Sequence, residues 1–398
     1  MKAFGNITIL AATVLLSAVV SSCVRNESVA ELGDDAPKEI CFRLTPVRTG
    51  TKAATFSSFP ADSAFGTCAW YLPDGKKWTT DGESSEIYVE PDKISFNPGN
   101  SVWKAWGSGK LYWWPQSGTL SFFCWAPYNL TERGLSLNNT DGIRIDGWSV
   151  INRPGYGGAT DYGKGQTMYG SASDGSVDIL TARSLELNGN TANVWEQADG
   201  SAFYGYGARI QFRHALCKVS FVLRLDYAPE DGKKWYVEDA VLKDIYTKAS
   251  LSGSTWGDYV SSSVKDYEIS FKEGENSENG LEINSTDNTV IFPKTMMIPQ
   301  PLTRSTAGTY TRIPRIELTV WKEGSYKDVT YGTVTRREKD TQILTGMLYS
   351  SNADIIRWSE GTDITYHLYI STGAENYIEF DASTEDWGTG TGSEIELK

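Results

Sequence analysis

The sequence predicts an all-β protein built from two antiparallel β-sandwiches. Apolar residues recur with a period of two along many short segments, and turn formers such as Pro73-Asp74-Gly75 separate these segments. No window carries the 3.6-residue periodicity of an amphipathic helix. Because domains usually hold about 100–200 residues, a chain of 398 residues favours two sandwiches over one.

The first two dozen residues predict an export signal. An apolar run over residues 7–20 is too short to cross a bilayer as a stable helix, and it leads through two serines into Cys23. Residues 20–23, Val-Ser-Ser-Cys, resemble a bacterial lipobox, in which the cysteine carries the lipid. We therefore expect residues 1–22 to be a signal peptide and Cys23 to be the lipid attachment site. A cleaved secretory signal with an incidental cysteine is the alternative.

The first strand is expected shortly after this signal. Residues 23–38 are polar and poor in bulky apolar side chains, which predicts a flexible, lipidated tether. From Glu39 onward the pattern changes, because Ile40, Phe42 and Leu44 alternate with other residues. This alternation is typical of a half-buried strand.

Later segments repeat the same alternation and predict further half-buried strands. The clearest are residues 120–126, 316–320, 364–370 and 378–382. Polar residues and glycines interrupt the strand pattern around Gly200. We therefore expect one domain over residues 39–200 and a second over residues 201–398.

One strand in the middle of the chain changes the parity of its apolar residues. Ile210 and Leu216 occupy even positions, whereas Val219 and Phe221 occupy odd ones. A β-bulge near Leu216, or a strand that changes sheets there, would reconcile the two halves. His214 then points inward, where we expect it to be a hydrogen-bonded core residue.

Composition and motifs argue against several classes of function. The formal net charge of −13 argues against binding to nucleic acid. Two distant histidines supply no HExxH helix and no local catalytic triad, and no CxxC pair marks a zinc or redox site. We expect no enzyme activity, no cofactor and no metal. A pair of carboxylates that meets only in space, as in a glycoside hydrolase, is the residual alternative. We expect the remaining cysteines to be buried thiols: Cys41, Cys68, Cys124 and Cys217.

An aromatic cluster is the strongest local feature, with Trp103, Trp106, Tyr112, Trp113 and Trp114 inside a dozen residues. Large aromatic side chains stabilise most where they are buried, so we expect them to fill cores and cover sheet edges. An exposed row would instead suit stacking on sugar rings. A surface lipoprotein that binds glycans without polymerising is therefore the alternative function.

Taken together and in order, short pieces of the chain resemble the fimbrillin family of pilus subunits and related lipoproteins, of the Bacteroides and Porphyromonas type. The pieces are the lipobox at Cys23, Phe59-Pro60, Phe65-Gly66-Thr67, Tyr112-Trp113-Trp114-Pro115, Leu120-Ser121-Phe122-Phe123, Val177-Asp178-Ile179-Leu180, Phe212-Arg213-His214-Ala215-Leu216, Met297-Ile298-Pro299-Gln300, Trp358-Ser359-Glu360-Gly361 with Tyr366, and Glu385-Asp386-Trp387. The resemblance implies two transthyretin-like β-sandwiches in tandem. It also implies a lipid-anchored, surface-exposed precursor at the cell outer membrane that is later incorporated into a fimbrium.

The resemblance further implies assembly by donor-strand exchange. In this family an Arg-specific protease cuts just beyond the first strand, and a strand of the next subunit fills the groove left behind. Arg48 is the implied cleavage residue, with Lys52 as the second candidate. The removable strand would be that of Ile40, Phe42 and Leu44.

The C-terminus offers a short candidate for the donor strand, in which Ile395 and Leu397 alternate with charged residues after a glycine-rich spacer. The implied partners are other fimbrial subunits, the protease, the membrane, and a ligand on a host or bacterial surface. Stalk, tip and anchor roles all stay open.

Overall fold

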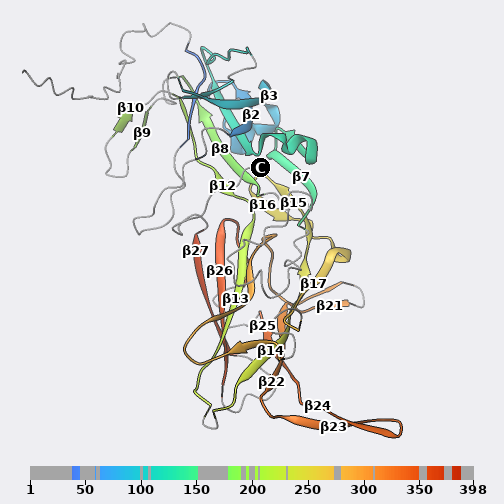
Figure 1. Ribbon diagram of the computed structural model, residues 1–398. Coiled ribbons are helices and arrows are strands. Elements are labelled where there is room, and N and C mark those ends of the chain that lie inside the picture. The colour runs from blue at the N-terminus through green and yellow to red at the C-terminus, as the bar shows by residue number, and fades with distance from the viewer. Residues whose placement is uncertain are drawn as a thin grey trace, which may run out of the picture. The chain divides into compact units, whose positions relative to one another are not determined.

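The computed structural model (Figure 1) describes residues 38–44, 59, 63–98, 102–105, 109–150, 178–189, 194–196, 202–204, 207–229, 232–272, 279–307, 310–348, 356–371 and 379–386. Residues 39–398 belong to one compact unit. Strands dominate this part of the chain, which confirms the predicted all-β class. The number of transthyretin-like sandwiches and the boundary near Gly200 stay predictions.

Eight strands form the largest sheet, here called the first sheet. In spatial order they are β11 (Ala208–Ile210), β1 (Phe42–Leu44), β4 (Val102–Lys104), β3 (Glu86–Asn97), β2 (Ala64–Leu72), β5 (Thr119–Ala126), β8 (Leu180–Leu187) and β12 (Arg213–His214).

A four-stranded second sheet joins strands from distant parts of the sequence, because β7 pairs with β15. Its strands are β16 (Thr255–Gly257), β15 (Lys248–Ser252), β7 (Gly142–Ser149) and β6 (Leu135–Asn138).

Two further sheets enclose a core of their own. The third sheet contains β19 (Thr289–Met297), β13 (Cys217–Leu225), β26 (Thr362–Ile370) and β27 (Glu379–Asp386). The fourth contains β17 (Val264–Ser270), β14 (Trp235–Tyr246), β22 (Arg315–Lys322) and β25 (Gln342–Met347), with β18 (Leu281–Ile283) also paired to β14. Their inward side chains form one hydrophobic cluster.

Three two-stranded ribbons and a few short helical turns complete the described elements. The ribbons are β9 (Val194–Glu196) with β10 (Ala202–Tyr204), β20 (Ser305–Ala307) with β21 (Tyr310–Arg312), and β23 (Tyr326–Tyr331) with β24 (Val334–Lys339). The helical turns are α1 (Trp78–Asp81) and the 3₁₀ turns Gly82–Ser84, Tyr128–Arg133 and Ser261–Ser263. Within the described residues, no helix is long and apolar enough to span a membrane.

The two outer strands of the first sheet are consecutive in the chain. β11 pairs with β1 at one edge, and β12 pairs with β8 at the other, with only Gln211 and Phe212 between them. The hydroxyl of Ser184 in β8 also donates a hydrogen bond to the carbonyl oxygen of Arg209 in β11 at 2.5 Å. The two edges therefore meet, so that the sheet curls around its own core.

The parity change at Leu216 marks a strand that changes sheets, which is one of the two alternatives that the sequence left open. β12 ends at His214 in the first sheet, and β13 begins at Cys217 in the third. Between them, the amide of Ala215 donates to the carbonyl of Ile179, and the carbonyl of Leu216 accepts from the amide of Gly361.

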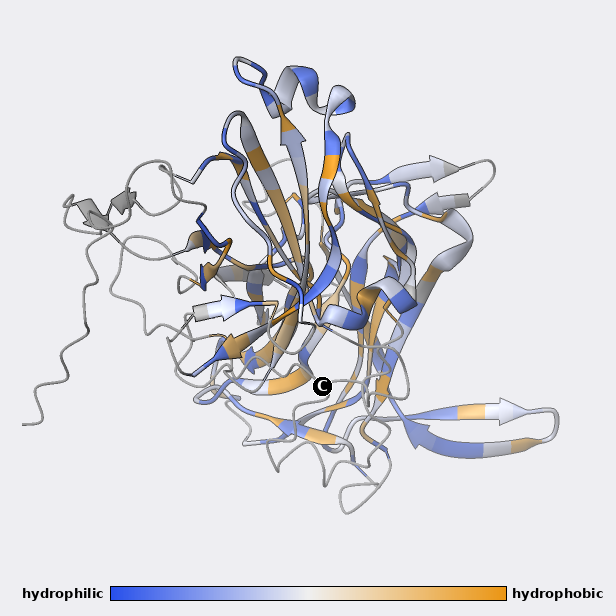
Figure 2. Cartoon of the chain, turned by 90° about the horizontal axis from the view of Figure 1, so that it is seen from above, coloured by the Kyte–Doolittle hydropathy of each residue, from blue (hydrophilic) through white to orange (hydrophobic). Residues whose placement is uncertain are grey.

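The strand over residues 119–126 differs from its prediction. It was expected to be half-buried, but seven of its eight residues, all except Thr119, are buried. Leu120 and Phe122 pack into the core inside the first sheet, whereas Phe123 and Trp125 pack against the second sheet. Because two hydrophobic clusters lie on opposite faces of β5, simple alternation predicts only one of them. In Figure 2, hydrophobic and hydrophilic residues are interspersed along many other strands.

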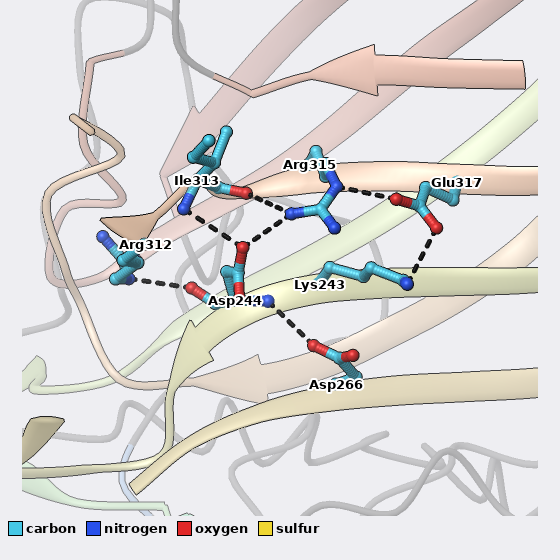
Figure 3. Close-up of polar contacts among 7 residues, drawn as sticks. All are labelled: Lys243, Asp244, Asp266, Arg312, Ile313, Arg315 and Glu317. Atoms are coloured by element: carbon cyan, nitrogen blue, oxygen red, sulfur yellow. Dashed lines mark hydrogen bonds and ion pairs between the residues drawn. The ribbon is translucent and has the colours of Figure 1, made fainter. Parts of the chain in front are cut away.

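A polar network interrupts the fourth sheet at Asp244 (Figure 3). Asp244 has a φ of 64° at a bulge in β14, and its carboxylate accepts from the guanidinium of Arg315 at 2.6 Å and from the amide of Ile313 at 3.1 Å. The guanidinium of the fully buried Arg312 donates to the carbonyl of Asp244 at 2.8 Å. It also donates to the carbonyl of Pro301 at 3.0 Å and to Oε1 of Gln300 at 2.6 Å, and it lies over the ring of Tyr246. The network holds together a bulge that the ladder alone leaves with unpaired groups.

Candidate functional site

Strand β1 is held on both sides by strands that come much later in the sequence. It pairs parallel with β11 through Phe42 and Ala208, and antiparallel with β4 through Phe42 and Trp103. Outside the strand proper, the amide of Ile40 donates to the carbonyl of Tyr112 at 2.7 Å, and the carbonyl of Cys41 accepts from the amide of Ala208 at 2.7 Å. The predicted first strand is therefore present, with Phe42–Leu44 in the ladder and Ile40 just before it.

The side chains of this strand fill the core of the first sheet. Ile40 and Phe42 are buried, and the half-buried Leu44 packs against the same cluster. The ring of Phe42 lies 5.9 Å from that of Phe65 and 5.3 Å from that of Phe122, both edge-on. These contacts make β1 a structural part of the cluster and not a covering segment.

A polar contact fixes the beginning of the strand. The ammonium of Lys104 in β4 lies 3.0 Å from Oε1 of Glu39, and both side chains are largely buried. Glu39 also forms an isolated bridge with Trp113. The start of β1 is thus attached to β4 and to the segment before Trp114.

After β1, the chain returns to the same core at Phe59. The Phe59 ring stacks on that of Phe212 at 5.2 Å and meets those of Trp103 at 5.3 Å and Phe65 at 6.0 Å. The described chain thus contacts this cluster both before residues 45–58, through β1, and after them, through Phe59.

The other predicted site residues lie outside the described part of the chain. They are the lipid attachment residue Cys23, the cleavage candidates Arg48 and Lys52, and the donor-strand residues Ile395 and Leu397. No pattern in the sequence predicts that β11 and β4 are the neighbours of β1, because these pairings join residues far apart in the chain.

The aromatic cluster is mainly structural. Trp103 and Trp114 are buried in the core of the first sheet, which confirms the expectation for these two residues. Tyr112 is half-buried, and its hydroxyl donates to Oδ2 of Asp92 at 2.8 Å. Trp113 differs, because it is 43% exposed. Trp106 lies outside the described residues.

Sequence reasoning missed a tyrosine beside Trp113 and a second tyrosine next to the first. Tyr88 in β3 is 40% exposed, and its hydroxyl donates to the carbonyl of Trp113 at 2.9 Å. The ring of Tyr71 in β2 lies 6.3 Å from that of Tyr88. Because Tyr88 stands between Ile87 and Val89, the sequence offers no sign that its ring faces solvent.

His214 and the cysteines have structural roles. Nδ1 of the buried His214 lies 2.7 Å from Oδ2 of Asp178, which confirms its prediction as a hydrogen-bonded core residue. The four described cysteines are buried thiols, as expected. Burial raises the pKa of the Cys124 thiol to about 12. Within the described residues, no group of three or more His, Cys, Asp or Glu side chains could hold a metal ion.

Comparison with solved structures finds proteins that resemble this chain in fold. A solved fimbrial protein from Bacteroides vulgatus ATCC 8482 matches with a TM-score of 0.53 and 14% identity, covering 88% of this chain and 99% of that one. A protein of Parabacteroides distasonis ATCC 8503, whose name suggests cell adhesion, has a TM-score of 0.45 and 11% identity over 90% of this chain and 98% of its own. A fimbrilin from Porphyromonas gingivalis W83 has a TM-score of 0.41 and 10% identity over 89% and 98%. At these identities only the fold is compared, and only the first score exceeds 0.5.

The curated proteins contain no match. The sequence profile described as fimbrillin-like, however, matches residues 51–387. Since this match spans most of the chain, the protein belongs to the fimbrillin-like family, whose members are structural fimbrial proteins and not enzymes.

Proposed function

We propose that this protein is a fimbrial subunit that polymerises by donor-strand exchange after its first strand is removed. One observation carries the proposal: β1 lies between β4 and β11, and Phe42 enters the core. Removal of β1 would unpair the facing edges of both neighbours and open an apolar trough at the same place. An incoming strand with alternating apolar residues would satisfy both at once.

The precursor is exported as a lipoprotein anchored to the outer membrane through Cys23 and is cut after Arg48 by an Arg-specific protease. Cleavage there hydrolyses the chain after β1 and before Phe59, so that Phe59 and its aromatic contacts stay with the mature subunit. Lys52 is the second candidate for the cut. The matured subunit joins the fimbrium with copies of itself or related subunits, and it supports adhesion to a host or bacterial surface ligand.

The donor in this proposal is the C-terminal segment, in which Ile395 and Leu397 alternate with Glu394 and Glu396. Two apolar side chains in alternate positions match the inward pair Phe42 and Leu44 that they would replace. The glycines of residues 388–392 would let the segment reach a neighbouring subunit.

The test uses the soluble chain from residue 24, which keeps the whole compact unit of residues 39–398. An Arg-specific protease is expected to cut once after Arg48, as read from the new N-terminus and the mass. Ladders of SDS-resistant oligomers should follow. Deletion of residues 394–398 should abolish the ladder and leave the cut intact.

Arg48→Gln is the matched variant for the cleavage site, and Lys52→Gln is its control. Arg48→Gln should prevent both the cut and the ladder, whereas Lys52→Gln should change neither. A clean cut that leaves a stable monomer with an intact C-terminus would refute strand exchange by this donor.

A glycan-binding surface lipoprotein is the second candidate, and the exposed rings of Tyr88 and Trp113 favour it. Aromatic faces of this kind stack on sugar rings. This candidate predicts that an immobilised glycan array retains the uncut chain and that Trp113→Ala abolishes the retention. If no glycan on the array retains the chain, the glycan-binding candidate is refuted.

A further inference from the structure

The β23–β24 ribbon is the most exposed element of the described chain. Most of its residues are exposed along both strands, and its six residue pairs run from Tyr326–Lys339 to Tyr331–Val334. Figure 1 shows it extending away from β22, and Figure 2 shows hydrophobic residues on a largely hydrophilic ribbon. An isolated two-stranded ribbon is at best marginally stable in water.

Contacts with the rest of the described chain are concentrated at the base of the ribbon. There the ring of Tyr326 lies 6.4 Å from that of Trp321, and the ammonium of Lys339 lies over Trp321 and 3.1 Å from Oε1 of Glu238. The base is therefore fixed to the fourth sheet, whereas at the far end the hydroxyl of Tyr331 donates within the ribbon itself, to Oε2 of Glu338 at 3.3 Å.

The far end displays the side chains that dominate protein interfaces. Tyr331 and Val334 face each other across the ribbon and are 58% and 52% exposed. Arg336 is exposed two residues further on, and its side chain makes no hydrogen bond or ion pair within the described chain. Tyrosine and arginine are enriched among the residues that supply most binding energy. We call Tyr331, Val334 and Arg336 the ribbon tip.

A second exposed patch in the described chain has complementary chemistry. Tyr88 and Glu90 are both exposed and lie two residues apart on β3, and Tyr88 contacts the exposed Trp113 and the half-buried Tyr71. We call these four residues the β3 patch. Two lysines of this region have other partners, because the ammonium of Lys110 lies 3.9 Å from Asp92 and that of Lys93 lies over the ring of Tyr128.

Glu90 gives the β3 patch a negative charge. Its side chain is exposed and makes no hydrogen bond or ion pair within the described residues. Burial, the hydrogen bond to Asp92 and the charges of Asp92 and Glu90 raise the pKa of Tyr112 well above its usual range. The patch therefore combines aromatic faces with an uncompensated carboxylate.

We propose that the ribbon tip of one copy of this chain docks on the β3 patch of a second copy. Tyr331 and Val334 would pack against Tyr88 and Trp113, and Arg336 would pair with Glu90. The occupant is a second copy because the two surfaces belong to different sheets and complement each other: both carry exposed aromatic rings, and Arg336 of the tip has the charge opposite to that of Glu90.

Such a contact is heterologous, since two different surfaces meet. Repeated from copy to copy it produces an open chain of subunits and not a closed dimer. The contact is small and is expected to be weak between separate monomers. It goes beyond strand exchange and does not depend on cleavage, but strand exchange would strengthen it by holding two copies together.

The experiment measures self-association of the uncut soluble chain from residue 24, by sedimentation at low ionic strength over a wide concentration range. Tyr331→Ala is expected to weaken association about tenfold, as for an interface hot spot. Arg336→Glu and Glu90→Arg should each weaken it about two- to fivefold, as for an exposed ion pair. Because every copy carries both surfaces, the double variant should recover the wild-type association.

Arg304→Glu is the matched control, since Arg304 is exposed and the net charge changes equally. Association that is absent in the wild type, or equal in Arg336→Glu and Arg304→Glu, would overturn the proposal. A loss in Glu90→Arg that Arg336→Glu does not share would also overturn it and assign the β3 patch to another ligand, such as a glycan. None of these measurements uses the protease. Strand exchange is therefore tested separately, by the SDS-resistant ladder.

Discussion

The ring of Phe42 in β1 meets the ring of Phe122 in β5 edge-on, with 5.3 Å between centroids and 88° between planes. Phe42 is only 2% exposed, although it belongs to the strand proposed for removal. The uncut subunit therefore completes its own core with the strand that the proposed exchange would replace.

Phe42→Ala is expected to lower the free energy of unfolding of the uncut protein by about 3–5 kcal/mol, because it leaves a cavity against two other rings. Urea denaturation followed by tryptophan fluorescence measures the loss. Leu44→Ala is the matched control and should cost less, since Leu44 is only half-buried. Equal costs for the two variants would contradict the central place of Phe42 in this core.

The buried thiols should resist alkylation until the protein unfolds. Burial raises the pKa of Cys124 to about 12, and burial likewise raises the pKa values of Cys68 and Cys217 above the usual range of a thiol. Since the thiolate is the reactive form, iodoacetamide at pH 8 should leave these three residues unmodified in the native protein. Mass spectrometry with and without denaturant checks this. Rapid modification of native Cys124 would show that β2 and β5 separate readily.

Acid should weaken the ion pairs around Glu317. Burial raises the pKa of this carboxyl, but hydrogen bonds and charges from Lys243 and Arg315 outweigh it, and the net effect lowers the pKa below its ordinary value of 4.5. The unfolded chain then binds the proton first, so the contribution to stability is present above pH 4.5 and is lost as pH falls through the lower folded value. Denaturation of the wild type and Glu317→Gln across this range should show a difference that shrinks with falling pH. A difference in stability that stays the same across this pH range would contradict the lowered pKa of Glu317.

Arg312→Met is expected to cost about 2–5 kcal/mol of stability, because it removes the donor from three buried oxygens while keeping much of the side-chain volume. These acceptors are the carbonyls of Asp244 and Pro301 and Oε1 of Gln300. Thermal and urea unfolding measure the loss, and Arg336→Met serves as the exposed control. A loss no larger than that of the control would mean that the network adjusts without Arg312.

Local patterns predicted the strands but not their partners. The alternation of Ile40, Phe42 and Leu44 predicted a strand at the observed place. The parity change near Leu216 predicted either a bulge or a passage between sheets, and the structure has the passage. Both signals lie within about a dozen residues. Nothing comparable pointed to Arg312, whose partners come from distant segments, or to the solvent exposure of Tyr88.

The sequence by itself determined the all-β class, the strand that begins near Glu39 and the inward position of His214, because side-chain alternation with a period of two is a local property of a strand. Only the tertiary structure decided that β1 lies between β4 and β11, that both faces of β5 are buried, and that Trp113 is exposed whereas Trp103 is not. Strand pairing joins residues far apart in the chain, and burial depends on what packs over each face. Neither can be read from the neighbours of a residue in the sequence.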